Sequence, residues 1–159
     1  MEHSIHLTVA TVIQKEQEFL MVREYVNGRE VINQPAGHVE PHERLADAAL
    51  RETREETGFD VRLLGLIGLS TYYAESSNIT FHRVSFKAEL MTNQPDYDLD
   101  PEIIGTKWMS LDEISSCDHL RSPMVLRDVE LATTGSLYPL EILWENSTIP
   151  TPNQSETKF

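Results

Sequence analysis

The N-terminal part of the chain alternates between apolar runs and short polar segments, a pattern typical of strands joined by turns. Residues 5–13 are rich in β-branched side chains and partly alternate, which predicts a strand. A polar turn at 15–18 separates them from a second apolar run at 19–24. We therefore expect these two runs to form a hairpin, followed by a further turn at Asn27-Gly28.

Residues 45–57 have the character of a helix rather than a strand. They are rich in Ala, Leu, Arg and Glu and contain neither Pro nor Gly. Gly58 follows immediately, and glycine is the usual residue just past a helix end. Residues 33–39 are expected to form a loop before this helix, ending at Pro41.

The remainder of the chain predicts more strands and two helices. The expected strands are 61–73, interrupted at Gly65 and Gly68, then 80–90 and 107–109, and the expected helices start at Ser110 and span 121–132. Strands on both sides of a central helix predict an α/β sandwich. We expect residues 1–145 to form a single domain and the polar residues 146–159 to form a flexible C-terminal tail.

Composition and charge narrow the possible functions. The 159 residues carry a formal net charge of −13, which argues against a general binder of nucleic acids or anionic membranes. No apolar run is long enough to span a membrane, and the first residues do not resemble a secretory signal. Cys117 is the single cysteine, so no intrachain disulfide can form. These features predict a cytoplasmic protein.

Three carboxylates fall on one side of the predicted helix. At about 100° per residue, Glu52, Glu55 and Glu56 lie within an arc of roughly 100°. Such close carboxylates repel one another, and a hard divalent cation with oxygen ligands would turn that repulsion into binding. The alternative is an ordinary solvated helix face, which also carries Glu and Arg.

The neighbours of these carboxylates support the metal-binding interpretation. Ala48 and Ala49 lie one turn earlier on the same side, and we expect their small side chains to leave room for metal and phosphate. Arg51 and Arg54 are expected to point away from the arc. Arg51 is expected to reach Glu55 one turn later and to fix the orientation of that carboxylate.

Seven residues at fixed spacings resemble the signature of the Nudix hydrolase family. They are Gly37, Glu43, Arg51, Glu52, Glu55, Glu56 and Gly58. That family carries out magnesium-dependent cleavage of a diphosphate linked to another group. Thr53 stands where the family usually has an aliphatic residue, and it is isosteric with Val.

The resemblance implies a fold and a metal site. The implied fold is an α/β/α sandwich with a mixed β-sheet between helices. Glu52 and Glu56 would be the main ligands of Mg²⁺, with Mn²⁺ as a possible substitute. Glu55 would join directly or through water, and the backbone carbonyl of Gly37 would add a ligand. Glu43 would support the helix start and bond Arg51.

The general base is expected outside the signature. By resemblance, the family often draws an additional glutamate from a loop, and Glu102 is the first choice here. Asp98 and Asp100 in the same loop are rivals, and Glu75 is a weaker candidate. An acidic loop without a catalytic role is the alternative.

Three residues are candidates for substrate contacts. His38 follows Gly37 directly, and Arg23 and Arg121 are cations suited to phosphate. Each also has a simpler interpretation, as a loop-packing histidine or as a surface arginine.

Within the family, segments 33–38, 120–125 and 138–141 look like the phosphatase NudJ subgroup. That subgroup acts on nucleoside di- and triphosphates and on small organic diphosphates, so the expected partner is a small phosphorylated molecule. The alternatives are an ADP-ribose or nucleotide-sugar pyrophosphatase, a prenyl diphosphate isomerase and a non-catalytic ligand sensor. The enzymes for ADP-ribose commonly carry a proline where this chain has Ala74. The oligomeric state is expected to be monomer or homodimer.

Overall fold

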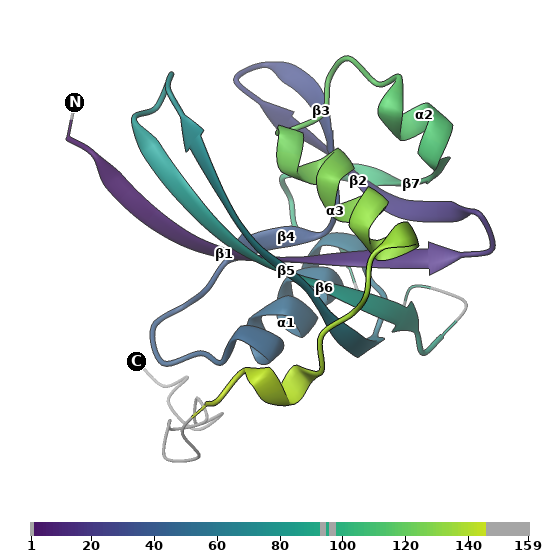
Figure 1. Ribbon diagram of the computed structural model, residues 1–159. Coiled ribbons are helices and arrows are strands. Elements are labelled where there is room, and N and C mark those ends of the chain that lie inside the picture. The colour runs from purple at the N-terminus through teal and green to yellow at the C-terminus, as the bar shows by residue number, and fades with distance from the viewer. Residues whose placement is uncertain (1, 93–94, 96–97, 146–159) are drawn as a thin grey trace, which may run out of the picture.

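A computed structural model describes residues 2–92, 95 and 98–145 (Figure 1). Its elements, in chain order, are β1 (Ser4–Lys15), β2 (Glu18–Val26), β3 (Arg29–Asn33), β4 (Ala36–His38), α1 (Leu45–Thr57), β5 (Val61–Ala74), β6 (Ile79–Leu90), β7 (Ile103–Ser110), α2 (Leu111–Ser115), α3 (Pro123–Thr134) and the 3-10 helix η1 (Leu140–Ile142). The tail predicted at 146–159 lies outside the described residues. None of the helices in the described part is long and apolar enough to cross a membrane.

The strands form one mixed sheet in the order β3-β2-β1-β6-β5, with β4 paired to β1 and β7 paired to β2. Strands β1 and β6 run parallel, and the other pairs are antiparallel. Helices α1 and α3 lie on opposite faces of the sheet (Figure 1). The predicted α/β sandwich with a mixed sheet between helices is therefore confirmed.

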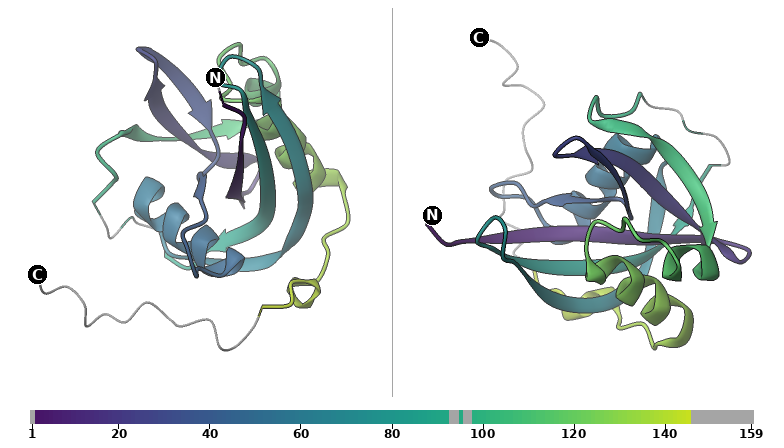
Figure 2. Two further views of the ribbon diagram at one scale, coloured as in Figure 1. Left: turned by 90° about the vertical axis from the view of Figure 1, so that its left-hand side faces the viewer. Right: turned by 90° about the horizontal axis from the view of Figure 1, so that it is seen from above.

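Strand β1 divides the sheet into two halves. It pairs with β2 only near their shared turn, at Gln14–Phe19 and Lys15–Glu18. Beyond that turn β1 continues beside β4 and β6, whereas β2 pairs with β3 and β7. The predicted hairpin exists, but its arms diverge, and the two halves of the sheet curve away from each other (Figure 2).

Helix α1 has the predicted bounds, and its glycine stop is confirmed. Gly58 adopts φ 74°, the left-handed conformation that glycine reaches without strain. The prediction for Ala48 and Ala49 was wrong, because both are fully buried in a core with Val9 and Phe86. Their small side chains bring the helix close to the sheet, and they leave no space for a ligand.

Thr53 also belongs to the buried face of α1. It is completely buried, and its Oγ1 lies 2.8 Å from Thr11 Oγ1 and donates to Ala49 O at 2.7 Å. The hydroxyl that replaces an aliphatic group is thus satisfied, as a buried polar atom must be.

Several predicted boundaries shift. The loop expected at 33–39 contains β4, which pairs with β1. Gly65 and Gly68 do not interrupt β5; the register with β6 shifts at both places, as at β-bulges. Strand β7 is longer than expected, β3 was not predicted, and α3 begins at Pro123, where proline fits the first helical turn.

Candidate active site

Arg51 lies at the centre of the acidic face of α1. Its Nε donates to Glu43 Oε1 at 2.7 Å, and its Nη2 donates to Glu43 Oε2 at 2.9 Å. Its Nη1 donates to Glu52 Oε1 at 2.7 Å and to Glu55 Oε2 at 3.1 Å. The predicted bonds from Arg51 to Glu55 and Glu43 are confirmed. The expectation that Arg51 points away from the arc was wrong, because its long side chain curls back between the carboxylates. Arg54 does point elsewhere and pairs with Asp60.

The Arg51 network ties the helix to the preceding loop. Arg51 Nη2 also donates to the backbone carbonyl of His38 at 3.0 Å, and Glu43 Oε2 accepts from the Glu40 amide at 3.0 Å. The hydrogen bonding of Arg51 to Glu43 is the main cause of the raised Arg51 pKa. Glu43 therefore fixes the side chain of Arg51, and Arg51 in turn orients the carboxylates of Glu52 and Glu55.

Gly37 lies directly against the carboxylate of Glu52. A Cβ built on Gly37 would overlap the carboxylate carbon and both oxygens of Glu52. Strand β4 thus passes over the acidic face of α1 at van der Waals distance. Burial raises the pKa of Glu52, and Arg51 partly opposes the shift.

Glu56 is the most enclosed of the three carboxylates. Its Oε2 accepts a hydrogen bond from the Ala36 amide at 2.9 Å. Burial raises the pKa of Glu56 well above its ordinary value, and the nearby charges of Glu24, Glu52 and Asp100 raise it further. A cation beside these groups would favour the ionised carboxylate instead.

Glu24 was missed by the sequence reasoning. It belongs to β2, and its Oε1 accepts from Asn33 Nδ2 at 3.1 Å. The signal was the alternation along β2, which places Glu24 and Arg23 on opposite faces of the strand. Only the tertiary structure shows that the face with Glu24 is turned towards Glu56.

The loop before β7 reaches the C-terminal part of α1. The Asp100 amide donates to the backbone carbonyl of Glu55 at 2.8 Å, and the Glu102 amide donates to Asp100 Oδ1 at 3.2 Å. Asp98, Asp100 and Glu102 are all exposed. Glu75 lies in the turn between β5 and β6, away from α1 (Figure 1). Of these candidates, Asp100 is the one whose charge acts on Glu56.

The three predicted substrate contacts are placed differently from one another. Arg121 Nε lies 3.8 Å from Glu24 Oε1, so its charge is near the acidic face. His38 Nε2 lies 2.8 Å from His6 Nδ1, and both rings lie near Phe81. Burial and the neighbouring His6 lower the pKa of His38.

Arg23 is placed away from this site. It forms an ion pair with Glu30, Nε to Oε1, at 2.7 Å. The surface pocket around that pair is lined by neither the α1 carboxylates nor Gly37. The structure therefore places Arg121 beside Glu24 and leaves Arg23 away from the acidic face. The His38 ring is turned towards His6 and Phe81, while the His38 backbone carbonyl reaches Arg51.

The acidic face has the right donors for a hard divalent cation. Its side-chain donors are all carboxylate oxygens, the type that Mg²⁺ and Mn²⁺ favour. Among residues 2–92, 95 and 98–145, no group of three or more His, Cys, Asp or Glu side chains is arranged to hold a metal ion. The reason is visible in the contacts: Glu52 and Glu55 are turned towards Arg51, and Glu56 towards the Ala36 amide. The residue types fit the ion, and binding requires these carboxylates to exchange partners.

Most of the chain is similar to known proteins. The protein-family model described as the NUDIX domain matches residues 4–131 of this chain. Phosphatase NudJ of Escherichia coli strain K12 is 38% identical over 138 residues, which cover 87% of this chain and 90% of that protein. The protein of the same name from Shigella flexneri matches equally well.

Solved structures of proteins from the same family are also similar to this chain. A NUDIX hydrolase from Nitrosomonas europaea is 36% identical, with a TM-score of 0.85 over 89% of this chain and 97% of its own. The MutT protein from Methanosarcina mazei Go1 is 26% identical, with a TM-score of 0.66 over 81% of this chain and 92% of its own.

Proposed function

The chain belongs to the Nudix family of hydrolases, and on that premise we propose that it hydrolyses a nucleoside di- or triphosphate or a small organic diphosphate. The observation that carries this proposal is the packing of Gly37 against Glu52, beside Glu55 and Glu56. Because Gly37 has no side chain, the backbone of β4 can lie against the Glu52 carboxylate, which places backbone and carboxylate oxygens close enough to bind one ion.

Four groups of this chain are proposed to hold a divalent metal, Mg²⁺ or Mn²⁺. They are the carboxylates of Glu52, Glu55 and Glu56 and the backbone carbonyl of Gly37. When bound, the ion supplies charge neutralisation at the phosphate oxygens and lowers the pKa of a water molecule. In the structure Arg51 Nη1 holds one oxygen of Glu52 and one of Glu55, so these carboxylates would have to turn from Arg51 to take the ion.

A carboxylate near the reacting water is needed to accept its proton. Sequence reasoning favoured Glu102 for this role, and Glu102 remains a candidate. The structure supports Asp100 more strongly, because the backbone of Asp100 is tied to Glu55 and its charge acts on Glu56. We assign the proton acceptor to Asp100 and keep Glu102 as the comparison.

The substrate class is proposed from the relatives and from the chain itself. Proteins 38% identical to this chain are named phosphatases. Arg121, which lies near Glu24, and His38, which follows Gly37 directly, are proposed to contact the substrate. Arg23 is not proposed for that role, because it is paired with Glu30. A cytoplasmic location and a monomeric or homodimeric state stay predictions.

A panel assay tests the function. Purified protein with Mg²⁺ is offered nucleoside di- and triphosphates, ADP-ribose, a nucleotide sugar and thiamine diphosphate, and the products are separated by chromatography. We expect phosphate or pyrophosphate from the nucleotides or the thiamine compound, no turnover in excess EDTA, and recovery on adding Mg²⁺.

Each alternative predicts a different product. AMP released from ADP-ribose as the preferred reaction would support a nucleotide-sugar pyrophosphatase. Tight binding of one of these compounds without any product would support a non-catalytic sensor. Turnover that persists in EDTA would contradict the metal-dependent mechanism.

A further inference from the structure

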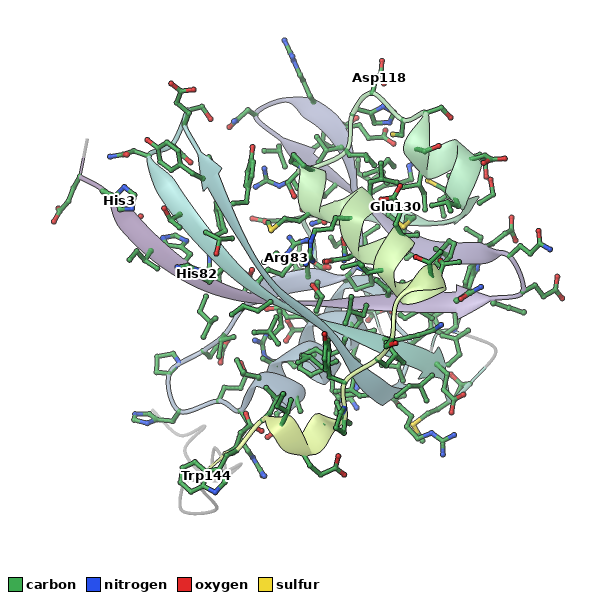
Figure 3. The ribbon with its side chains drawn as sticks, viewed as in Figure 1. His3, His82, Arg83, Asp118, Glu130 and Trp144 are labelled. Carbon is green, nitrogen blue, oxygen red and sulfur yellow. The ribbon has the colours of Figure 1, made fainter. Side chains whose placement is uncertain are left out.

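Arg83 is a buried cation near the acidic face, and the functions considered above do not use it. It lies on β6, and only 6% of its surface is exposed. Figure 3 shows it in the interior of the molecule, where the strands cross beside α3. Removing a guanidinium from water is costly unless its donors are paired, so the partners of Arg83 decide what it does.

Its hydrogen bonds are incomplete. The Nε of Arg83 is buried and has no hydrogen-bond partner. In the described part of the chain, its guanidinium makes one hydrogen bond, from Nη1 to Gln34 Oε1, which is long at 3.4 Å. A guanidinium has five N–H donors, so most of its capacity is unused.

The buried carboxylate of Asp128, whose charge acts on Arg83, is already hydrogen-bonded to other groups. Asp128 is fully buried, and its Oδ2 accepts from Ser85 Oγ at 2.5 Å and from Gln34 Nε2 at 3.0 Å. Its Oδ1 accepts from Arg127 Nη1 at 3.1 Å. Asp128 therefore acts on Arg83 as a nearby charge rather than as a hydrogen-bonded partner.

The other charges around Arg83 belong to the proposed active site. Burial lowers the pKa of Arg83, and the negative charges of Asp128, Glu56 and Glu24 oppose that effect. Arg121 is close enough to lower the pKa slightly further. Arg83 and Arg121 are thus two cations near Glu24 and Glu56, whereas Arg51 is paired with Glu43 and Glu52.

We infer that Arg83 is a substrate-binding residue whose free guanidinium N–H groups donate hydrogen bonds to a phosphate oxygen of the diphosphate that the ion at Glu52 and Glu56 would hold. A phosphate supplies the several acceptor oxygens that this guanidinium lacks, and the planar fork of arginine matches them. The inference rests on the proposed function for the location of the diphosphate. It adds a residue from β6, outside both the signature and the loops.

The test separates ligand binding from folding and from metal binding. Arg83→Gln and Arg83→Lys are compared with the parent, and Arg62→Gln is the control, because Arg62 is an exposed arginine paired with Glu89 on the same sheet. Binding of methylene diphosphonate, a diphosphate that cannot be hydrolysed, is measured by calorimetry with Mg²⁺ present. The affinity for Mn²⁺ alone is measured by electron paramagnetic resonance, and the denaturant midpoint in EDTA reports on folding.

We expect Arg83→Gln to weaken diphosphonate binding by roughly 10- to 100-fold, the usual effect of losing hydrogen bonds to a charged group. The affinity for Mn²⁺ and the denaturant midpoint should stay near those of the parent, because Arg83 is poorly paired without a ligand. The diphosphonate affinity of Arg83→Lys should lie between those of the parent and of Arg83→Gln, since lysine keeps the positive charge but lacks the planar set of N–H donors. Arg62→Gln should bind like the parent.

Two results would overturn the assignment. One is binding of the diphosphonate by Arg83→Gln with parental affinity. The other is a loss of binding that is matched by a lower denaturant midpoint and by weaker Mn²⁺ binding, which would make Arg83 a structural partner of Asp128. If Arg83→Gln does not fold, Arg83→Met, which fills similar space without a charge, is judged by the same measurements.

Failure of the proposed function is recognised separately. If the parent protein hydrolyses none of the panel compounds yet binds diphosphonate through Arg83, the catalytic proposal fails and the binding residue stands. If the parent is active and Arg83→Gln binds the diphosphonate equally well, the catalytic proposal stands and the assignment of Arg83 fails.

Discussion

Gly37 and Glu52 share one small space, because a Cβ on Gly37 would overlap the Glu52 carboxylate. The two residues come from different elements, β4 and α1, so their contact fixes how closely the strand approaches the acidic face. No backbone strain is involved, since Gly37 is not among the residues with positive φ. The requirement for glycine is one of space alone.

Gly37→Ala should therefore disturb the metal site. The added methyl group must displace Glu52, and we expect a loss in kcat/KM of about 10²-fold or more, comparable to removing one electrostatic stabiliser. Affinity for Mn²⁺, measured by electron paramagnetic resonance, should fall as well. Gly68→Ala is the control, because a Cβ there meets only Arg127 Nη2 at an ordinary 3.8 Å. Equal activity of the two variants would contradict the proposed role of the contact.

Arg51→Gln should destabilise the protein more in EDTA than in Mg²⁺. Without Arg51, Glu43, Glu52 and Glu55 lose their shared cation, and removal of one partner from a partly buried ion network costs about 2–4 kcal/mol. A bound Mg²⁺ replaces part of that positive charge. Free energies of unfolding from urea titrations in both conditions check this prediction.

Arg54→Gln is the matched control for Arg51→Gln. Arg54 is on the same helix and pairs with Asp60, but nearly half of its side chain is exposed. Exposed pairs contribute at most about 1 kcal/mol, so its loss should be small in both conditions. A similar loss for both variants would show that Arg51 is an ordinary surface arginine.

Glu56→Gln should change how stability depends on pH when EDTA is present. The folded-state pKa of Glu56 is raised, so the folded protein binds a proton more tightly than the unfolded chain does. Stability from this group is complete below the ordinary glutamate pKa and is lost as pH rises through the raised pKa. The variant cannot ionise at position 56, so its stability should decline less over that range.

Urea titrations from acidic to neutral pH check this expectation, and parallel pH profiles of parent and variant would contradict it. Catalysis by Glu56→Gln should also fall, by about 10²-fold or more, because one negative oxygen donor is lost. The amide oxygen of the new glutamine can still accept the hydrogen bond from the Ala36 amide, so we expect the variant to fold.

Asp100→Asn and Glu102→Gln separate the two loop carboxylates. Loss of the proton acceptor should lower kcat by roughly 10²-fold, within the usual range for general-base catalysis, and excess Mg²⁺ should not restore it. We expect this behaviour from Asp100→Asn and a near-parental kcat from Glu102→Gln. The opposite ranking would return the role to Glu102, and rescue of either variant by Mg²⁺ would make that residue a metal ligand.

Local patterns in the sequence determined the elements of the site. Helix α1 and its stop at Gly58 followed from composition and from the conformational freedom of glycine, both of which act within a few residues. The common face of Glu52, Glu55 and Glu56 followed from the helical period. The spacing of the signature residues can be read from the sequence alone, so it also predicted the family and, through the family, the sandwich with a mixed sheet.

The environment of those carboxylates was decided by the tertiary structure. Ala48 and Ala49 were predicted to leave space for a ligand, but they belong to the hydrophobic core. The sequence does not show which side of α1 the sheet covers. Glu24 and Arg83 come from strands far along the chain from α1, and their charges meet at Glu56 only after the sheet has formed. Contacts between distant strands depend on register and on burial, and neither is encoded in a spacing of residues along one element.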